Sequence, residues 1–261
     1  SGRKVFYFFP AGTYHTTVVR DIIRKEYEIY TLSDYKRGLP LIFQYNGALV
    51  FFNVDKLSRY EQVRTTIRDF CRQTSHRSIE LFLLTRSDER AEELEKYMAE
   101  MSNCRPLLLP DDPVEGGGKL VELLQYFNAR GQRRYVRFGS NNDEIAGIEI
   151  VRKTRKHVGK VHDISSAGLS FSMPKGPSFT VRTRLKDFVL DISENHFSEK
   201  MEGLSGTITI KRKLPNGTML YVLMLEKGLP SDVYERLHTI IHGSLQKQFS
   251  KRLRSVAVPE T

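Results

Sequence analysis

The chain has few cysteines and no long apolar segment, and both absences limit what it can be. Only Cys71 and Cys104 occur among its 261 residues, too few for a disulfide framework and without the spacing of metal ligands. No window of eighteen or more consecutive apolar residues is present, so the sequence predicts no membrane span. No apolar N-terminal core with a cleavage site appears either. We therefore expect a cytoplasmic globular protein with no metal site.

Excess positive charge is confined to the second half of the chain. The net charge is +10 at pH 7. Residues 1–128 hold 18 basic and 18 acidic side chains, whereas residues 129–261 hold 23 basic and 13 acidic ones. A basic module beside a neutral one predicts an anionic partner for the basic module.

The first 127 residues alternate short apolar runs with amphipathic segments. Runs at Lys4–Phe9, Glu28–Leu32 and Gly47–Asp55 favour buried strands. Two more follow at Glu80–Thr85 and Pro106–Leu109. Segments between them place apolar residues three or four positions apart, as amphipathic helices do. This alternation predicts a parallel α/β sheet.

The order of these elements resembles the flavodoxin-like receiver fold of response regulators over residues 3–127. A working receiver has an Asp at the end of its third strand and an acidic pair after the first, which holds Mg²⁺. Asp55 ends the third run, but Pro10-Ala-Gly12 follows the first. We therefore expect a degenerate receiver-like domain in which Asp55 caps a strand-to-helix turn. The alternative is a phosphorylatable receiver that controls the second half.

The glycine run Gly116-Gly-Gly-Lys119 does not fit a phosphate-binding loop. That pattern has four residues between its glycines and a Ser or Thr after the Lys, where this chain has Leu120. We expect a flexible loop here, followed by a last helix at Lys119–Phe127.

From residue 144 onward, short runs alternate apolar and polar residues. Six or seven such runs, among them Phe179–Leu185, predict a small antiparallel barrel. Leu214-Pro-Asn-Gly-Thr218 predicts a hairpin, because Asn-Gly adopts positive φ at low cost. An amphipathic segment after Pro230-Ser231 predicts a C-terminal helix. We expect an α/β domain at 3–127, an Arg-rich linker at 128–138, and a β-barrel with its C-terminal helix at 139–254.

Two short motifs flank the start of this barrel. Arg133-x-x-x-Arg137 lies in the linker, and Asp163-x-Ser165-x-x-Gly168 begins 26 residues after Arg137. Each motif alone is weak, since the arginine spacing recurs several times in the N-terminal half. Their order and their position around the first barrel strands make the combination informative.

This combination resembles the PilZ domain, the bacterial receptor family for the second messenger cyclic di-GMP, over residues 129–250. The resemblance implies that Arg133 and Arg137 wrap over the ligand. It also implies that Asp163 and Ser165 receive one guanine base. At Gly168, the missing side chain would let the backbone approach the ligand closely.

The chemistry of these residue types suits cyclic di-GMP. Arginine matches O6 and N7 of guanine with two parallel N–H donors, and its flat guanidinium stacks on a purine. Further arginines can pair with the two phosphates. The opposite guanine edge carries N–H donors that a carboxylate accepts.

The arginine register has an alternative, because Arg130-x-x-x-Arg134 fits the spacing as well. We favour Arg133 and Arg137, since Arg137-Phe138 adjoins the barrel and a double arginine resembles the family pattern. Arg134 is then a third ligand contact.

We expect a non-enzymatic cyclic di-GMP receptor with an unidentified protein partner. Ligand would fix a mobile Arg-rich joint and change the orientation of the two domains. The alternative is a nucleic-acid-binding regulator that uses the basic second half. We consider it less favoured, because the sequence has no aromatic-rich RNA signature and no recognition-helix motif.

Overall fold

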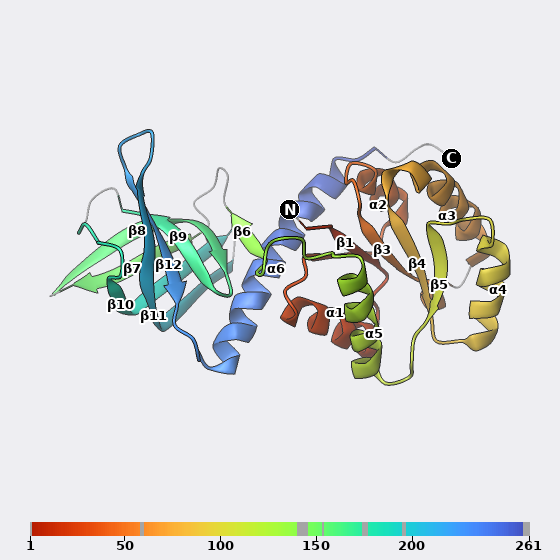
Figure 1. Cartoon of the computed structure of the whole chain (residues 1–261), viewed down its shortest axis with the longest axis horizontal. Coiled ribbons are helices and arrows are strands. Elements are labelled where there is room, and N and C mark those ends of the chain that lie inside the picture. Colours follow the sequence, from red (N-terminus) through yellow and green to blue (C-terminus); the bar gives the residue numbers. More distant parts are fainter. Residues whose placement is uncertain are drawn as a thin grey trace. The chain divides into compact units, whose positions relative to one another are not determined.

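The computed structural model describes residues 2–57, 60–139, 146–152, 154–173, 177–194 and 197–257. The chain forms two compact units (Figure 1). Unit 1 comprises Ser1–Arg134 together with His242–Thr261, and unit 2 comprises Tyr135–Ile241. Unit 1 contains a parallel sheet and unit 2 an antiparallel barrel, so the predicted combination of an α/β half and an all-β half is confirmed.

Unit 1 is built on five parallel strands in the order β2-β1-β3-β4-β5. They are β1 (Val5–Phe8), β2 (Ile29–Leu32), β3 (Leu49–Asn53), β4 (Glu80–Thr85) and β5 (Cys104–Leu108). Every residue of β1 and β3 is buried. Apart from Asn53 at the end of β3, these two strands are apolar throughout, as expected in a parallel sheet that is covered on both faces. The strand order is that of flavodoxin-like folds.

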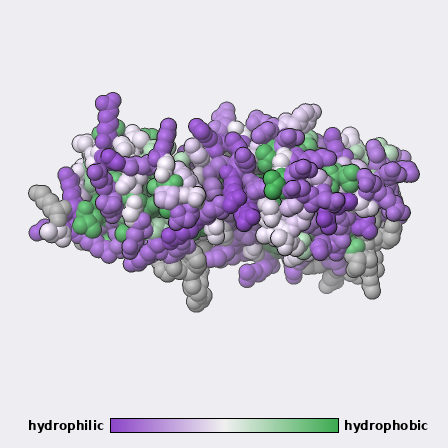
Figure 2. Space-filling view, turned by 90° about the horizontal axis from the view of Figure 1, so that it is seen from below, coloured by the Kyte–Doolittle hydropathy of each residue, from purple (hydrophilic) through white to green (hydrophobic). Residues whose placement is uncertain are grey.

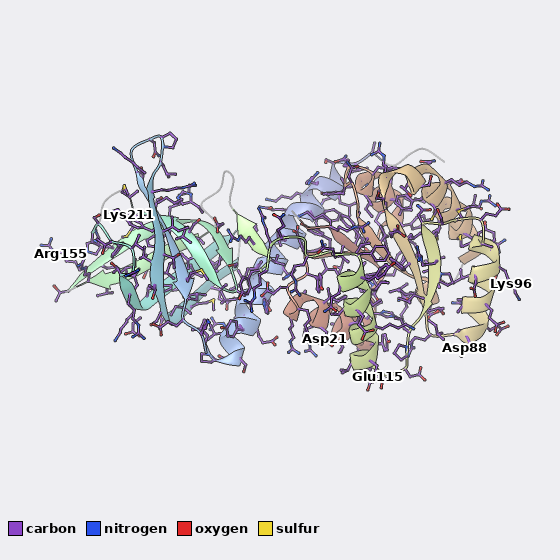
Figure 3. The ribbon with its side chains drawn as sticks, in the orientation of Figure 1. Asp21, Asp88, Lys96, Glu115, Arg155 and Lys211 are labelled. Carbon is purple, nitrogen blue, oxygen red and sulfur yellow. The ribbon has the colours of Figure 1, made fainter. Side chains whose placement is uncertain are left out.

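Helices connect these strands. They are α1 (Thr13–Arg24), α2 (Tyr35–Ile42), α3 (Tyr60–Thr74), α4 (Asp88–Met98) and α5 (Pro113–Tyr126), with 3-10 turns η1 (Val54–Lys56) and η2 (Ser75–Arg77). The side chain of Ser87 caps α4 by accepting from the Arg90 amide. Asp88 lies in its first turn and Lys96 in its last (Figure 3). An acidic residue at the N-terminus and a basic residue at the C-terminus interact favourably with the helix dipole, so the cap and both charges stabilise α4.

The glycine run lies inside α5, so the expected flexible loop before that helix is wrong. A Cβ at Gly116 would meet Oη of Tyr14 at 2.1 Å, and a Cβ at Gly117 would meet Oδ2 of Asp21 at 3.0 Å. Tyr14 and Asp21 belong to α1, and Figure 3 labels Asp21 there. Two glycines therefore allow α5 to lie close against α1.

Unit 2 contains a closed antiparallel barrel. Its strands are β7 (Ala146–Arg152), β8 (Arg155–Ser165), β9 (Gly168–Ser172), β10 (Arg184–Glu194), β11 (Phe197–Lys213) and β12 (Met219–Leu225). They pair in the order β8-β7-β10-β11-β12-β9, and β9 pairs back with β8. A short strand, β6 (Arg137–Gly139), adds to the end of β8. Closure leaves the six barrel strands without an open edge, which suits a small all-β domain.

One predicted strand is partly wrong. Residues 179–183 precede β10 without forming a strand. They contain a turn, closed by a 3.1 Å bond from the Thr183 amide to the Thr180 carbonyl. Phe179 is nevertheless buried, with its ring 5.3 Å from that of Tyr221. The apolar pattern correctly indicated that Phe179 is buried, but a residue can be buried without belonging to a strand.

The hairpin predicted between the last two barrel strands is present. The Leu214 amide donates to the Thr218 carbonyl at 2.8 Å, which closes the turn between β11 and β12. Gly217 has a φ of +82°. This left-handed conformation is one that glycine adopts at low cost.

The last helix, α6 (Ser231–Arg254), contributes to both units, because their division falls between Ile241 and His242. Beyond that point, Phe249 belongs to the core of unit 1. Its ring lies 5.4 Å from Phe6 and 4.7 Å from Tyr30. We expected the whole helix within the barrel domain, whereas its second half packs on the α/β sheet.

The face of the molecule shown in Figure 2 is mainly hydrophilic. On this face, apolar side chains form small separate patches (Figure 2). Scattered exposure of this kind is ordinary in folded proteins. Within the described ranges, no helix combines the length and the apolar character needed to cross a membrane.

Candidate functional site

Strand pairing brings residues from both predicted motifs together on unit 2. β6 pairs with β8 so that Arg137 lies opposite Ser165. Opposite residues in an antiparallel ladder point to the same face and lie about 5 Å apart. Asp163, two positions before Ser165, shares that face. Phe138 and Ile164 alternate with these residues and are buried in the core. Arg137, Asp163 and Ser165 therefore lie on the face turned away from the core, called the motif face below, where Arg137 is exposed, Asp163 is half-buried and Ser165 is 6% exposed.

The Asp/Ser/Gly motif forms the hairpin between β8 and β9. Ser165 pairs with Gly168, and Ser166-Ala167 makes the turn. The Ser165 hydroxyl donates to the Gly168 carbonyl at 3.1 Å. The amide of Leu225 donates to the Ala167 carbonyl at 2.9 Å. The hairpin is thus closed on itself and tied to the end of β12.

A bulge at His162 sets which residues face outward. Val161 pairs with Phe171, and Asp163 pairs with Ser170, so His162 is an extra residue between two registered pairs. An extra residue reverses the alternation of side chains along the rest of a strand. Without it, Asp163 would point to the core instead of the motif face.

Two serines of β9 contact the side chains around the bulge. The Ser170 hydroxyl donates to Oδ2 of Asp163 at 2.5 Å. Oγ of Ser172 lies 2.8 Å from Nε2 of His162. Burial, and secondly the charge of Lys160, lower the pKa of His162. Oδ1 of Asp163 has no hydrogen-bond partner among the residues that the structure describes. That oxygen can accept from a ligand.

A glycine at position 168 is required by the neighbouring strand. A Cβ there would meet the Leu223 carbonyl oxygen at 2.3 Å and Cα of Met224 at 3.2 Å. Both atoms belong to β12, so Gly168 allows β9 and β12 to approach and close the barrel. Its predicted role in letting a ligand approach is separate from this one and stays a prediction.

The arginine cluster is divided between the units. Arg130 is half-buried in unit 1, where it donates to the Lys25 carbonyl and lies 4.8 Å over the Tyr27 ring. Arg133 and Arg137 are exposed and form no ion pair with any described residue. Arg130, the first residue of the alternative register, is therefore already engaged.

Asp55 joins the ends of two strands in unit 1. Its carboxylate accepts from the Thr85 hydroxyl at 2.6 Å and from the Arg86 amide at 2.9 Å. Arg90 completes the contacts with an ion pair of 3.4 Å. These bonds tie Asp55 to the turn after β4. The turn after β3 is capped by Asn53, whose side chain accepts from the Asp55 amide at 3.2 Å, so the expectation that Asp55 caps this turn is wrong.

A buried histidine that we did not select from the sequence lies in the same unit. His15 is 5% exposed, and its Nε2 lies 3.0 Å from the Asn53 amide nitrogen. That amide can only donate, so Nε2 accepts and Nδ1 carries the proton that Tyr7 Oη receives. Burial, reinforced by the charge of Arg86, lowers the pKa of His15 to about 4. Asn53, a polar residue at the end of the apolar run of β3, was the sequence feature that could have indicated a buried polar partner such as His15.

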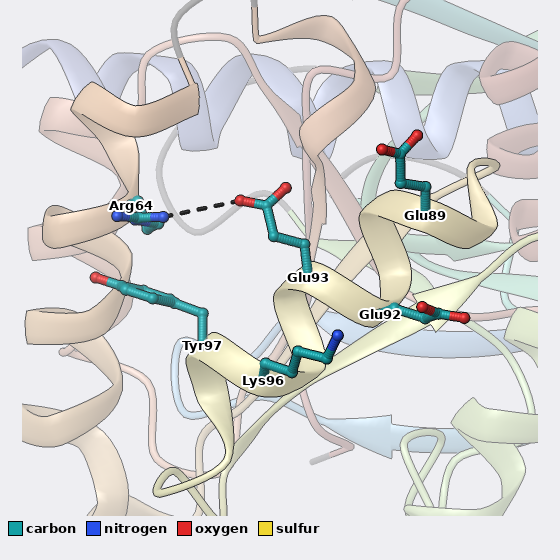
Figure 4. Close-up of a pocket in the computed structure, with 6 residues that line it drawn as sticks. All are labelled: Arg64, Glu89, Glu92, Glu93, Lys96 and Tyr97. Atoms are coloured by element: carbon teal, nitrogen blue, oxygen red, sulfur yellow. Dashed lines mark ion pairs between the residues drawn. The ribbon is translucent and has the colours of Figure 1, made fainter.

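Unit 1 also has a shallow hollow of about 610 Å³ on α3 and α4 (Figure 4). Glu93 faces Arg64 there at 3.8 Å, and the Arg64 guanidinium lies 4.2 Å over the Tyr97 ring. The hollow is lined by Arg64, Glu89, Glu92, Glu93, Lys96 and Tyr97. With three glutamates it is poorly suited to an anionic ligand, and it contains no residue of the predicted motifs.

No family model and no curated protein matches this chain. Among solved structures, the Bacillus subtilis inhibitor of motility (MotI/DgrA) is similar at 16% identity over 46% of this chain and 53% of that chain, with a TM-score of 0.38. The PilZ domain of Escherichia coli YcgR with c-di-GMP is similar at 14% identity over 48% of this chain and 99% of that one, with a TM-score of 0.38. The K. pneumonia MrkH–c-di-GMP complex is similar at 18% identity over 46% and 55%, with a TM-score of 0.39. The chain thus spans about half the length of the first of these proteins.

Proposed function

We propose that this protein is a non-enzymatic, cytoplasmic receptor for cyclic di-GMP, and that the motif face binds one of its guanine bases. The observation that carries the proposal is the pairing of Arg137 with Ser165 across β6 and β8. It joins two sequence motifs that are separated along the chain, in the order that resembles the PilZ family. The barrel around them is of the small antiparallel class that the resemblance implies.

The contacts of the motif face support a specific role for each side chain in this proposal. The Ser165 hydroxyl donates to Gly168, so towards a ligand it acts as an acceptor. Together with Oδ1 of Asp163, it suits the N–H donors of a guanine edge. A phosphate offers only acceptors and would find no donor in this pair. Arg137, exposed beside them, supplies paired donors to guanine or to a phosphate.

Arg133 and Arg134 would contact the ligand from the segment between the units. The Ala129 carbonyl accepts from the Arg3 amide at 2.8 Å, so the chain is attached to unit 1 just before this segment. Arg137 attaches it to the barrel through β6. A ligand that holds Arg133 beside Arg137 would restrict the segment and change the orientation of the units. Such a change would expose or hide a surface for a protein partner.

Isothermal titration with cyclic di-GMP tests ligand binding. Wild type should bind at micromolar ligand, and Arg137→Ala should weaken binding about tenfold or more through loss of a charge-assisted bond. Arg152→Ala is the matched control, because Arg152 is also exposed on the barrel but lies at the far end of β7. Absence of wild-type binding, or full binding by a folded Arg137→Ala variant, would refute the proposal.

The same titration distinguishes the two arginine registers. Arg133→Ala should weaken binding, whereas Arg130→Ala should leave binding intact because Arg130 is engaged by Lys25 and Tyr27. Small-angle scattering with and without ligand tests reorientation, and superimposable profiles would exclude it. A DNA duplex titrated across a salt series tests the nucleic-acid alternative, which predicts a steep loss of affinity with salt.

A further inference from the structure

The motif face continues onto apolar side chains of β12 and β11. In the ladder, Arg137 lies opposite Ser165, Ser165 opposite Gly168, and Gly168 opposite Met224. These four residues form one row across β6, β8, β9 and β12. Since opposite residues share a face, Met224 points to the same side of the sheet as Arg137. It is 42% exposed.

A second row runs beside the first. Asp163 lies opposite Ser170, Ser170 opposite Val222, and Val222 opposite Ile210. Ile210 is 51% exposed and Val222 is half-buried. The polar half of each row thus ends in aliphatic side chains on β12 and β11.

Gly168 brings the two halves of the first row close together. It has no side chain, and the space that a Cβ would occupy is filled by the backbone of β12, with the Leu223 carbonyl oxygen at 2.3 Å and Cα of Met224 at 3.2 Å. Ser165 and Met224 are two strand spacings apart, about 10 Å. A flat base whose edge meets Asp163 and Ser165 would extend over Gly168 towards Met224.

We propose that Met224, Val222 and Ile210 form an apolar platform that contacts the face of the guanine ring bound by Asp163 and Ser165. The inference rests on the proposed function and adds the residues that receive the ring face. Purine faces are apolar, and methionine sulfur makes favourable contacts with aromatic rings. Other exposed apolar side chains of the barrel, such as Val151 on β7, lie outside these rows.

The test is titration of cyclic di-GMP into the full chain carrying Met224→Ser, Met224→Leu or Val151→Ser. Met224→Ser should weaken binding about threefold to tenfold, as expected for loss of apolar contact with the ring. Met224→Leu should restore most of the affinity because it restores the apolar surface. Val151→Ser, which changes a more exposed apolar side chain elsewhere on the barrel, should bind like wild type.

Methyl spectra of ¹³C-methionine-labelled protein provide a second measurement. Cyclic di-GMP should shift the Met224 methyl signal by ring current, and Met224→Leu identifies that signal by its loss. Wild-type affinity in Met224→Ser together with an unmoved Met224 signal would overturn the platform and leave the receptor proposal intact. Absence of wild-type binding would overturn the receptor proposal itself, so the two failures differ.

Discussion

The Ser170 hydroxyl on β9 donates a 2.5 Å hydrogen bond to the Asp163 carboxylate on β8, directly across the ladder. This bond fixes one carboxylate oxygen and leaves Oδ1 directed to other partners. A side chain held in this way loses less rotational freedom when it accepts from a ligand. Ser170 is therefore a positioning residue for the proposed base contact.

Ser170→Ala should weaken cyclic di-GMP binding about threefold to tenfold, because one hydrogen bond contributes about 1 kcal/mol. Ser172→Ala is the control. Ser172 lies two residues further on the same strand, but contacts His162 instead of Asp163. Titration calorimetry measures both variants, and equal losses in the two would show that β9 is merely perturbed.

Gly168→Ala should destabilise the barrel irrespective of ligand. Its Cβ would lie 2.3 Å from the Leu223 carbonyl oxygen, so β9 and β12 would have to separate. We expect a loss of about 1–3 kcal/mol in the free energy of unfolding, as for other overpacked sites. Thermal unfolding without ligand measures it.

Gly118→Ala is the matched glycine change. Gly118 is exposed inside α5, and a Cβ there would meet nothing within 4 Å. Alanine should therefore stabilise the helix by up to about 1 kcal/mol. A Gly168→Ala variant as stable as wild type would contradict the close approach of β9 and β12.

The sequence was sufficient for features that depend on local pattern. Buried strands such as β1 are apolar at every position, and Asn216-Gly217 specifies its hairpin directly. Phe179 was misassigned, because an apolar residue can be buried from a turn as well as from a strand. The local pattern of apolar and turn-forming residues indicates which residues are buried and where turns lie, and these two features predict most of the helices and strands.

Long-range pairing was beyond the sequence. The motif residues were identified from their spacing, but the bulge at His162 and the pairing of Arg137 with Ser165 arise only when the barrel closes. The division of α6 between the two units could not be predicted either, because its contacts with unit 1, such as that between Gln246 and Thr31, join residues 215 positions apart. Such contacts depend on the whole fold, and the spacing of apolar residues along the chain does not predict them.

His15 should make unit 1 less stable in acid. Its pKa is about 4 in the folded protein against 6.5 in the unfolded chain. Between these values the unfolded chain binds more protons, so stability is complete above pH 6.5 and is lost as the pH falls to about 4. Urea unfolding at several pH values, followed by a probe in unit 1, measures this slope.

His15→Gln removes the titrating group and should flatten that part of the pH profile. It should also reduce stability at pH 7, because the contacts to Tyr7 and Asn53 change. His157→Gln, a half-buried position on β8, should retain the wild-type slope. An unchanged slope in His15→Gln would show that another group causes the acid sensitivity.

Gln246 on α6 covers the edge of the parallel sheet. Its Oε1 accepts from the Thr31 amide at 2.9 Å, and its Nε2 donates to the Thr31 carbonyl at 2.8 Å. Thr31 lies on β2, an edge strand whose outer peptide groups have no neighbouring strand. The side-chain amide thus takes the place of a strand and protects an edge that could otherwise pair with another chain.

Gln246→Leu should lower the free energy of unfolding by about 1–3 kcal/mol, because it leaves both partly buried peptide groups of Thr31 without their partner. Hydrogen exchange at the Thr31 amide should accelerate, since local opening no longer breaks a bond to α6. Gln248→Leu is the control, because Gln248 is exposed on the same helix and should change neither quantity. Slow exchange at Thr31 in the Gln246→Leu protein would mean that apolar packing, led by Phe249 against Phe6 and Tyr30, holds α6 on the sheet without the polar contact.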